Sequence, residues 1–137
     1  PPLLRLIMKV KGTDRTALIT DAMRAAGMPP GESILGSLRD GLKVIIEDGV
    51  AKLPDRSSFA GSVATTDRLV RTMVTMADVS VLDAVRMATR TPARILEIQD
   101  RKGALIHGKD ADIVIFNDDI QIQMTMVNGR IIYTKGN

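Results

Sequence analysis

Residues 16 to 23 read TALITDAM, a run of β-branched and apolar residues that ends on an acidic side chain. Short runs of this kind, here Thr16 to Thr20, are typical of buried parallel strands. The preceding segment, Leu3 to Val10, places its apolar residues at helical spacing and is followed by Gly12, which can end a helix. A helix followed at once by a buried strand is an αβ unit, so the sequence predicts an α/β fold.

Asp21 follows the predicted strand directly. Functional groups in parallel α/β sheets and barrels lie at the C-terminal ends of strands. A carboxylate there can act as a general base, act as a general acid or bind a metal. Aspartate also caps turns often, and its position alone leaves both interpretations open.

A β-hairpin is predicted farther along the chain. Ala25 to Gly31 is rich in loop-forming residues. Leu42 to Glu47 and Val50 to Leu53 are short apolar runs separated by Asp48-Gly49, a two-residue turn signal. A polar loop then leads to Phe59-Ala60-Gly61-Ser62.

Two helices are predicted in the middle of the chain. The first has its apolar residues at helical spacing: Leu69, Val70, Met73, Val74 and Ala77. The second begins at Ser80, with Asp83 three residues later as a weak capping box. We expect its buried face to consist of Leu82, Val85 and Ala88. Thr91-Pro92 ends it, and Pro92 can open a short helix through Leu96.

The last third of the chain changes to a period of two. After Gly103, Asp112 to Phe116 predicts a strand, and apolar and polar residues alternate from Ile120 to Met126. Asn128-Gly129 is a strong hairpin turn signal, and Arg130 to Thr134 is the expected return strand. These features predict a small β unit.

Composition excludes several classes of protein. The 137 residues are 45% hydrophobic and 26% charged, enough apolar material for one globular domain. The net charge of +3 comes from interleaved residues, and aromatics are 2%, so no nucleic-acid partner is expected. The chain has no cysteine and no apolar run that approaches a membrane span, which favours a cytoplasmic protein without a membrane partner. A first residue other than methionine indicates truncation or processing.

The other candidates for chemistry are weaker. His107, the only histidine, is expected to be a solvated loop residue because the nearby sequence offers no group to orient it. The Phe59 to Ser62 stretch is either a substrate loop, whose glycine lets a ligand approach the backbone, or a plain lead into a helix. Asp118-Asp119 is expected to mark a turn. Catalytic zinc takes three protein ligands, so this chain is expected to supply no metal site.

Five segments together resemble the amidohydrolase superfamily, and within it the N-acetylglucosamine-6-phosphate deacetylase family. They are Leu18 to Met23, Phe59 to Ser62, Leu82 to Leu96, Lys102 to Phe116 and Val127 to Arg130. The segment from Lys102 is shared across the superfamily. The Thr-Asp-Ala strand end together with the Ala-Gly-Ser loop indicates the deacetylases.

The resemblance implies an activity and assigns roles. It implies deacetylation of N-acetylglucosamine 6-phosphate to glucosamine 6-phosphate and acetate. Asp21 matches the catalytic aspartate, which takes a proton from metal-bound water and later delivers one to the leaving amine. Phe59, Ala60 and Gly61 match positions that contact the sugar phosphate. A divalent metal, zinc or iron, is implied for the full-length enzyme, with ligands outside this chain, and so is a homodimer or larger homo-oligomer.

The implied fold is the C-terminal part of a metal-dependent (β/α)8 barrel plus a small closing β-sandwich segment. Residues 1–98 would be the barrel portion, with the last strand, a hairpin insert and the final helices, and residues 99–137 the β-domain portion. The fragment alone is expected to be inactive. Two alternatives stay open: another amidohydrolase, such as a cyclic amidase or deaminase, and a noncatalytic fragment or assembly module.

Overall fold

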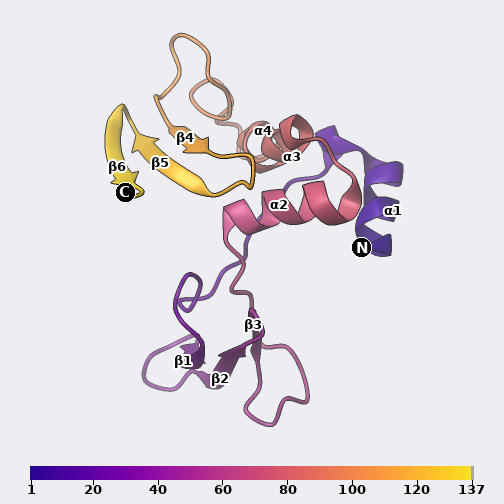
Figure 1. Cartoon of the computed structure of the whole chain (residues 1–137), viewed down its shortest axis with the longest axis vertical. Coiled ribbons are helices and arrows are strands. Elements are labelled where there is room, and N and C mark those ends of the chain that lie inside the picture. The colour runs from indigo at the N-terminus through magenta and orange to yellow at the C-terminus, as the bar shows by residue number, and fades with distance from the viewer. Residues whose placement is uncertain (137) are drawn as a thin grey trace. The chain divides into compact units, whose positions relative to one another are not determined.

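The computed structural model describes residues 1–136 and divides them into two compact units. The first unit contains Pro1–Leu18 and the chain from Asp67 onward, and the second is Ile19–Thr66. Each has its own three-stranded antiparallel sheet, and the helices belong almost entirely to the first (Figure 1). The fold is therefore α/β, as predicted.

The second unit is built on the predicted hairpin. Strands β2 (Leu42–Glu47) and β3 (Val50–Lys52) pair in antiparallel fashion, and the turn residues Asp48 and Gly49 both have positive φ, 53° and 71°. Such angles are those of a type I′ turn, which matches the twist of the strands. The hairpin is confirmed.

Strand β1 (Gly31–Leu35) was not expected from the sequence. It pairs with β2, with Ile34 opposite Lys43 and Leu35 opposite Leu42. Its first two residues, Gly31 and Glu32, are of types depleted in strands, so ladder hydrogen bonds with β2, rather than local propensity, stabilise it. The small core of this unit consists of Ala25, Val44, Ile46, Ala51 and Ala60, with Met23, Leu35, Leu53 and Val63 packed against it.

The helices of the first unit begin and end close to the predicted residues. Helix α1 (Pro2–Lys11) ends at Gly12, and a 3₁₀ turn, η1 (Thr13–Arg15), follows. Three further helices are α2 (Thr66–Ala77), α3 (Val81–Ala88) and α4 (Arg90–Ile95). Ser80 caps α3 as predicted, because its hydroxyl oxygen accepts a 3.1 Å hydrogen bond from the Asp83 amide.

The predicted buried face of α3 is wrong in its first residue, Leu82. Leu82 is 60% exposed, whereas Ala84 and Met87 are fully buried, and Val85 and Ala88 are half-buried. Residues two apart lie about 200° apart around a helix, so Leu82 and Ala84 lie on nearly opposite faces. The core that selects the second face consists of Val70, Met73, Ala77, Val79, Ala84, Met87 and Ile120.

The predicted buried strand Thr16 to Thr20 is also wrong. The stretch forms no strand, and Ile19 is 72% exposed. A parallel strand requires a neighbouring strand, and residues 1–136 place none beside this stretch. The Leu18 amide instead donates a 2.9 Å hydrogen bond to the carbonyl of Met87 near the end of α3.

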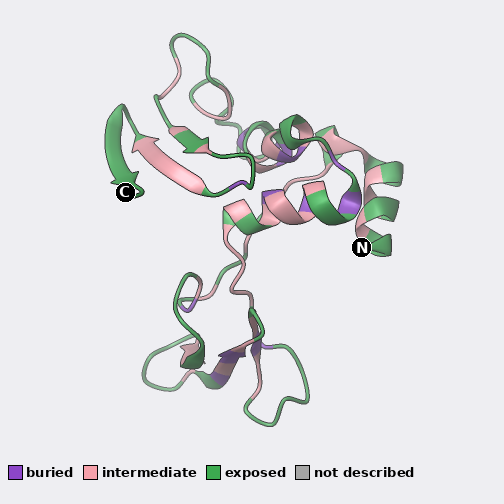
Figure 2. Ribbon diagram, in the orientation of Figure 1, coloured by how far each residue is buried: buried purple, intermediate pink, exposed green. Residues whose placement is uncertain are grey.

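The C-terminal β unit is confirmed. Strands β4 (Ile113–Phe116), β5 (Ile122–Val127) and β6 (Arg130–Thr134) form an antiparallel meander. Asn128 and Gly129 have φ of 48° and 76°, the values of the predicted turn. Strand β6 is exposed along its whole length (Figure 2). Among residues 1–136, no helix has the length and apolar character needed to cross a membrane.

Candidate active site

The second unit brings together the two segments that carry the predicted site residues. One is the segment around Asp21, and the other is the loop Phe59–Ser62, hereafter the 59–62 loop. Ala22 forms an isolated parallel bridge with Ser62, and the Met23 amide donates a 2.8 Å hydrogen bond to the Ser62 carbonyl. All four predicted residues therefore belong to one local structure.

Asp21 is exposed and has a left-handed backbone, with φ of 46°. Aspartate tolerates this region better than most residues, yet the conformation costs free energy and persists only where neighbouring contacts hold it. Backbone of this kind is enriched at functional sites. Its exposed carboxylate can meet a ligand from solvent.

The 59–62 loop is anchored on its other side by strand β3. Phe59 forms an antiparallel bridge with Lys52, and the Ala60 amide donates a 2.9 Å hydrogen bond to the Ala51 carbonyl. The ring of Phe59 is 75% exposed, while Ala60 is buried in the core of the unit. The loop thus presents one aromatic ring to solvent from a fixed backbone.

Gly61 occupies a position that excludes side chains. Its φ is +93°, and a Cβ atom added there would lie 3.1 Å from Leu35 Cδ1 and 3.3 Å from Met23 Sδ. Both the backbone angle and the limited space favour glycine. Leu35 and Met23 therefore fill the space where a Gly61 side chain would stand, while the residue itself is exposed.

An ion-pair network supports the polar loop that precedes Phe59. Arg56 donates two hydrogen bonds to the Glu47 carboxylate, 2.8 and 3.1 Å long, and Lys52 donates a third of 3.1 Å. These bonds, those from Arg56 first, hold the pKa of Glu47 below its usual value. Glu47 and Arg56 are nine residues apart, so no local sequence pattern indicates this pair.

The weaker candidates lie in the first unit. His107 is exposed in a turn, and Asp118 and Asp119 also form a turn, as predicted. Within residues 1–136, no three His, Cys, Asp or Glu side chains are grouped closely enough to hold a metal ion. The donor groups of the described chain therefore do not fit a metal site by themselves.

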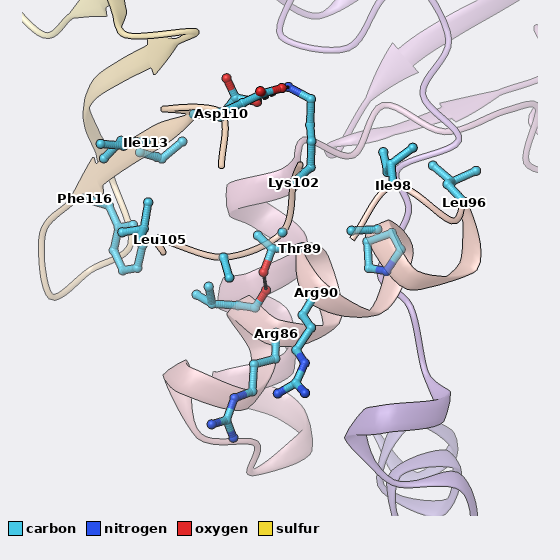
Figure 3. A pocket seen from close by; sticks show the side chains of 17 residues that line it. Arg86, Thr89, Arg90, Leu96, Ile98, Lys102, Leu105, Asp110, Ile113 and Phe116 are labelled. Carbon is cyan, nitrogen blue, oxygen red and sulfur yellow. Dashed lines mark hydrogen bonds and ion pairs between the residues drawn. The ribbon is translucent and has the colours of Figure 1, made fainter. Parts of the chain in front are cut away.

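A groove of about 590 Å³ lies in the first unit (Figure 3), and none of the four predicted residues lines it. Its lining is mainly apolar and includes Leu96, Ile98, Leu105, Ile113 and Phe116. Three of its charged lining residues are paired with one another, because Lys102 contacts the carboxylates of both Asp110 and Asp112. Its size alone does not make this groove the active site, since it contains none of the predicted site residues.

The ion pairs of Lys102 connect the segment after α4 to the last hairpin. Asp110 accepts hydrogen bonds from Lys102 and Arg101, at 2.9 and 3.0 Å, and Asp112 accepts one of 2.9 Å from the Asn128 amide in the β5–β6 turn. Hydrogen bonds from Lys102, the largest cause for each, hold the pKa of both aspartates below the usual 3.8, and the two aspartates raise the pKa of Lys102.

This network predicts a stability difference that depends on pH. Replacing Lys102 with Gln should lower the free energy of unfolding between the usual aspartate and lysine pKa values. The difference in unfolding free energy between wild type and variant should shrink as the pH falls below 3.8, because the aspartates become protonated at their lowered pKa values. It should shrink again as the pH rises above 10.5, because Lys102 loses its proton at its raised pKa. Urea unfolding of the wild type and the variant at a series of pH values measures this difference in free energy.

The control is Lys9→Gln in the last turn of α1. This variant should show a small difference without the narrowing on the acid side. A gap for Lys102→Gln that stayed constant down to pH 2 would contradict the assignment of the low aspartate pKa values to Lys102.

Comparisons with known proteins agree on one family. The Amidohydrolase family profile matches residues 6–132. The curated N-acetylglucosamine-6-phosphate deacetylase of Lysinibacillus sphaericus is 38% identical over 128 residues, which are 93% of this chain and 32% of that protein. A putative N-acetylgalactosamine-6-phosphate deacetylase of Escherichia coli K12 is 36% identical over 86% of this chain and 68% of its own length.

Solved structures give the same result. The N-acetylglucosamine-6-phosphate deacetylase of Pasteurella multocida superposes with a TM-score of 0.87 at 26% identity, over 98% of this chain and 34% of that one. A second solved structure is an aspartate-to-alanine mutant of the N-acetyl-D-glucosamine-6-phosphate deacetylase of Mycobacterium smegmatis in complex with N-acetyl-D-glucosamine-6-phosphate. It superposes with a TM-score of 0.85 at 33% identity, over 98% of this chain and 35% of that one. The chain spans about a third of the length of the first curated relatives. Since the family profile covers most of its residues, the chain belongs to the amidohydrolase family.

Proposed function

We propose that the complete protein containing this chain hydrolyses the acetamide of N-acetylglucosamine 6-phosphate to glucosamine 6-phosphate and acetate. The curated relatives carry that activity in their names. The observation that carries the proposal is the parallel pairing of Ala22 with Ser62, which sets Asp21 beside the 59–62 loop. An acidic group next to an open backbone loop suits a polar, acetylated substrate.

The proposed chemistry assigns two proton transfers to Asp21. Its carboxylate accepts a proton from the attacking water as the water oxygen bonds to the acetamide carbon. It then returns the proton to the amine nitrogen as the carbon–nitrogen bond breaks. Phe59, Ala60 and Gly61 contact the sugar phosphate, and Gly61 is exposed and carries no side chain of its own to hold a ligand away from the backbone.

The architecture of the complete protein is also a proposal. Residues 1–98 would complete the C-terminal part of a (β/α)8 barrel, and residues 99–137 would belong to a small β domain. Solved relatives that match the chain along nearly its whole length support this. We also propose a cytoplasmic homo-oligomer. The family generally uses a divalent metal, and we place zinc or iron on residues outside this chain, because residues 1–136 contain no group of three candidate ligand side chains.

Acetate release tests the proposal. The complete protein should release acetate from N-acetylglucosamine 6-phosphate, and unphosphorylated N-acetylglucosamine should be a much poorer substrate. A protein that is inactive on the sugar phosphate but opens a cyclic amide or releases ammonia from a base would favour another amidohydrolase. A complete protein inactive on the whole panel would favour a noncatalytic assembly module.

A second substrate has specific support. The Escherichia coli relative of which this chain covers 68% is a putative N-acetylgalactosamine-6-phosphate deacetylase. The two sugars are epimers, so the same reaction applies to both. The ratio of kcat/KM for the two epimers decides between them, and we expect the glucosamine form to be preferred.

A further inference from the structure

Met23 joins the two segments of the candidate active site. Its amide donates the 2.8 Å hydrogen bond to Ser62, and it follows Ala22, which pairs with the same residue. We propose that Met23 is a positioning residue that holds the Asp21 carboxylate in register with the 59–62 loop. This inference rests on the proposed function.

The side chain of Met23 also lies against the 59–62 loop. It is half-buried against the core of the second unit. Its Sδ and Cγ atoms lie 3.3 and 3.7 Å from the point where a Cβ on Gly61 would stand, so the thioether occupies the space that glycine leaves. Methionine is unbranched and fills irregular gaps well. The side chain therefore fixes the peptide of Gly61 from one side.

Asp21 depends on the same contacts. Its left-handed backbone, with φ of 46°, persists only where its surroundings hold it. The contacts on its C-terminal side are those of Ala22 and Met23 with Ser62. If the packing of Met23 is lost, Asp21 can relax toward an ordinary conformation. Its carboxylate then moves relative to a substrate bound at the 59–62 loop.

Three variants of the complete protein test this. Met23→Ala removes the packing, Met23→Leu keeps most of the volume, and Met28→Ala is the control, since Met28 is 60% exposed a few residues later. Per folded molecule, we expect Met23→Ala to lower kcat on the order of 10- to 100-fold, as small misplacements do, with a smaller rise in KM. Met23→Leu should recover to within about threefold of the wild type, because swaps of similar volume are tolerated.

Amide hydrogen exchange provides a readout that needs no activity. In Met23→Ala, the amides of residues 23 and 60, which donate the hydrogen bonds to Ser62 and Ala51, should exchange on the order of tenfold faster, because local opening becomes easier. Met28→Ala should match the wild type. A wild-type protein without deacetylase activity would refute the proposed function, and exchange would still decide whether Met23 holds the loop. In an active enzyme, wild-type exchange or wild-type kcat per folded Met23→Ala molecule would overturn the inference.

Discussion

Replacing Asp21 with asparagine is expected to lower the kcat of the complete protein by about 10²- to 10⁴-fold, the usual contribution of a general acid–base group. The amide of asparagine can neither accept the proton from water nor deliver it to the leaving amine. Asparagine also tolerates left-handed backbone, so the φ of 46° at this position can be retained. The loss should therefore appear in turnover rather than in folding, and steady-state acetate release measures it.

The matched control is Asp118→Asn. Asp118 is an exposed aspartate in a turn of the first unit. Its substitution therefore also removes one negative charge, but outside the unit that contains Asp21. We expect its kcat to stay within about twofold of the wild type, because surface substitutions away from special features have small effects. Normal turnover in Asp21→Asn would eliminate the role proposed for Asp21.

Truncating Met87 is the change with the largest expected effect on stability. Met87 is fully buried in α3, within the core that also contains Val70 and Met73 of α2. Replacing a buried methionine with alanine removes apolar contacts and leaves a cavity, which costs about 2–5 kcal/mol. Chemical unfolding of the 137-residue chain, followed by circular dichroism, should show this loss in the first unit.

Leu82→Ala is the matched control on the same helix. Leu82 is 60% exposed, so its truncation should cost less than about 1 kcal/mol. The pair also tests the corrected face of α3, since the apolar spacing favoured Leu82 as a core residue. A larger loss for Leu82→Ala than for Met87→Ala would contradict the packing described above.

The features that the sequence predicted well depend on local chemistry. Asp48-Gly49 and Asn128-Gly129 specify tight turns through their backbone preferences, and both hairpins formed as expected. Ser80 with Asp83 specifies a helix start in the same way. Each of these signals involves residues within a few positions of each other.

The features that the sequence did not predict depend on neighbours distant in the chain. Thr16 to Thr20 has strand character, but strand formation requires a partner strand, and the described residues place none beside it. Helical spacing allowed two faces of α3, and the packing of α2 selected the one with Met87. Strand β1 exists because β2 lies beside it, despite Gly31 and Glu32 at its start.

The candidate active site was predictable in part. Asp21 could be singled out from its place after an apolar run, and Phe59, Ala60 and Gly61 from the family resemblance. Their proximity could not, because it rests on the pairing of Ala22 with Ser62, forty residues apart. The Glu47–Arg56 pair was missed for the same reason.

The most direct test of the central claim is a crystal structure of the complete Asp21→Asn protein with N-acetylglucosamine 6-phosphate bound. The variant should retain the substrate without hydrolysing it. We predict that the acetamide lies within hydrogen-bond reach of the side chain at position 21, and that the sugar phosphate contacts Phe59, Ala60 and Gly61. A substrate bound with its acetamide away from position 21, or one that makes no contact with the 59–62 loop, would contradict the account.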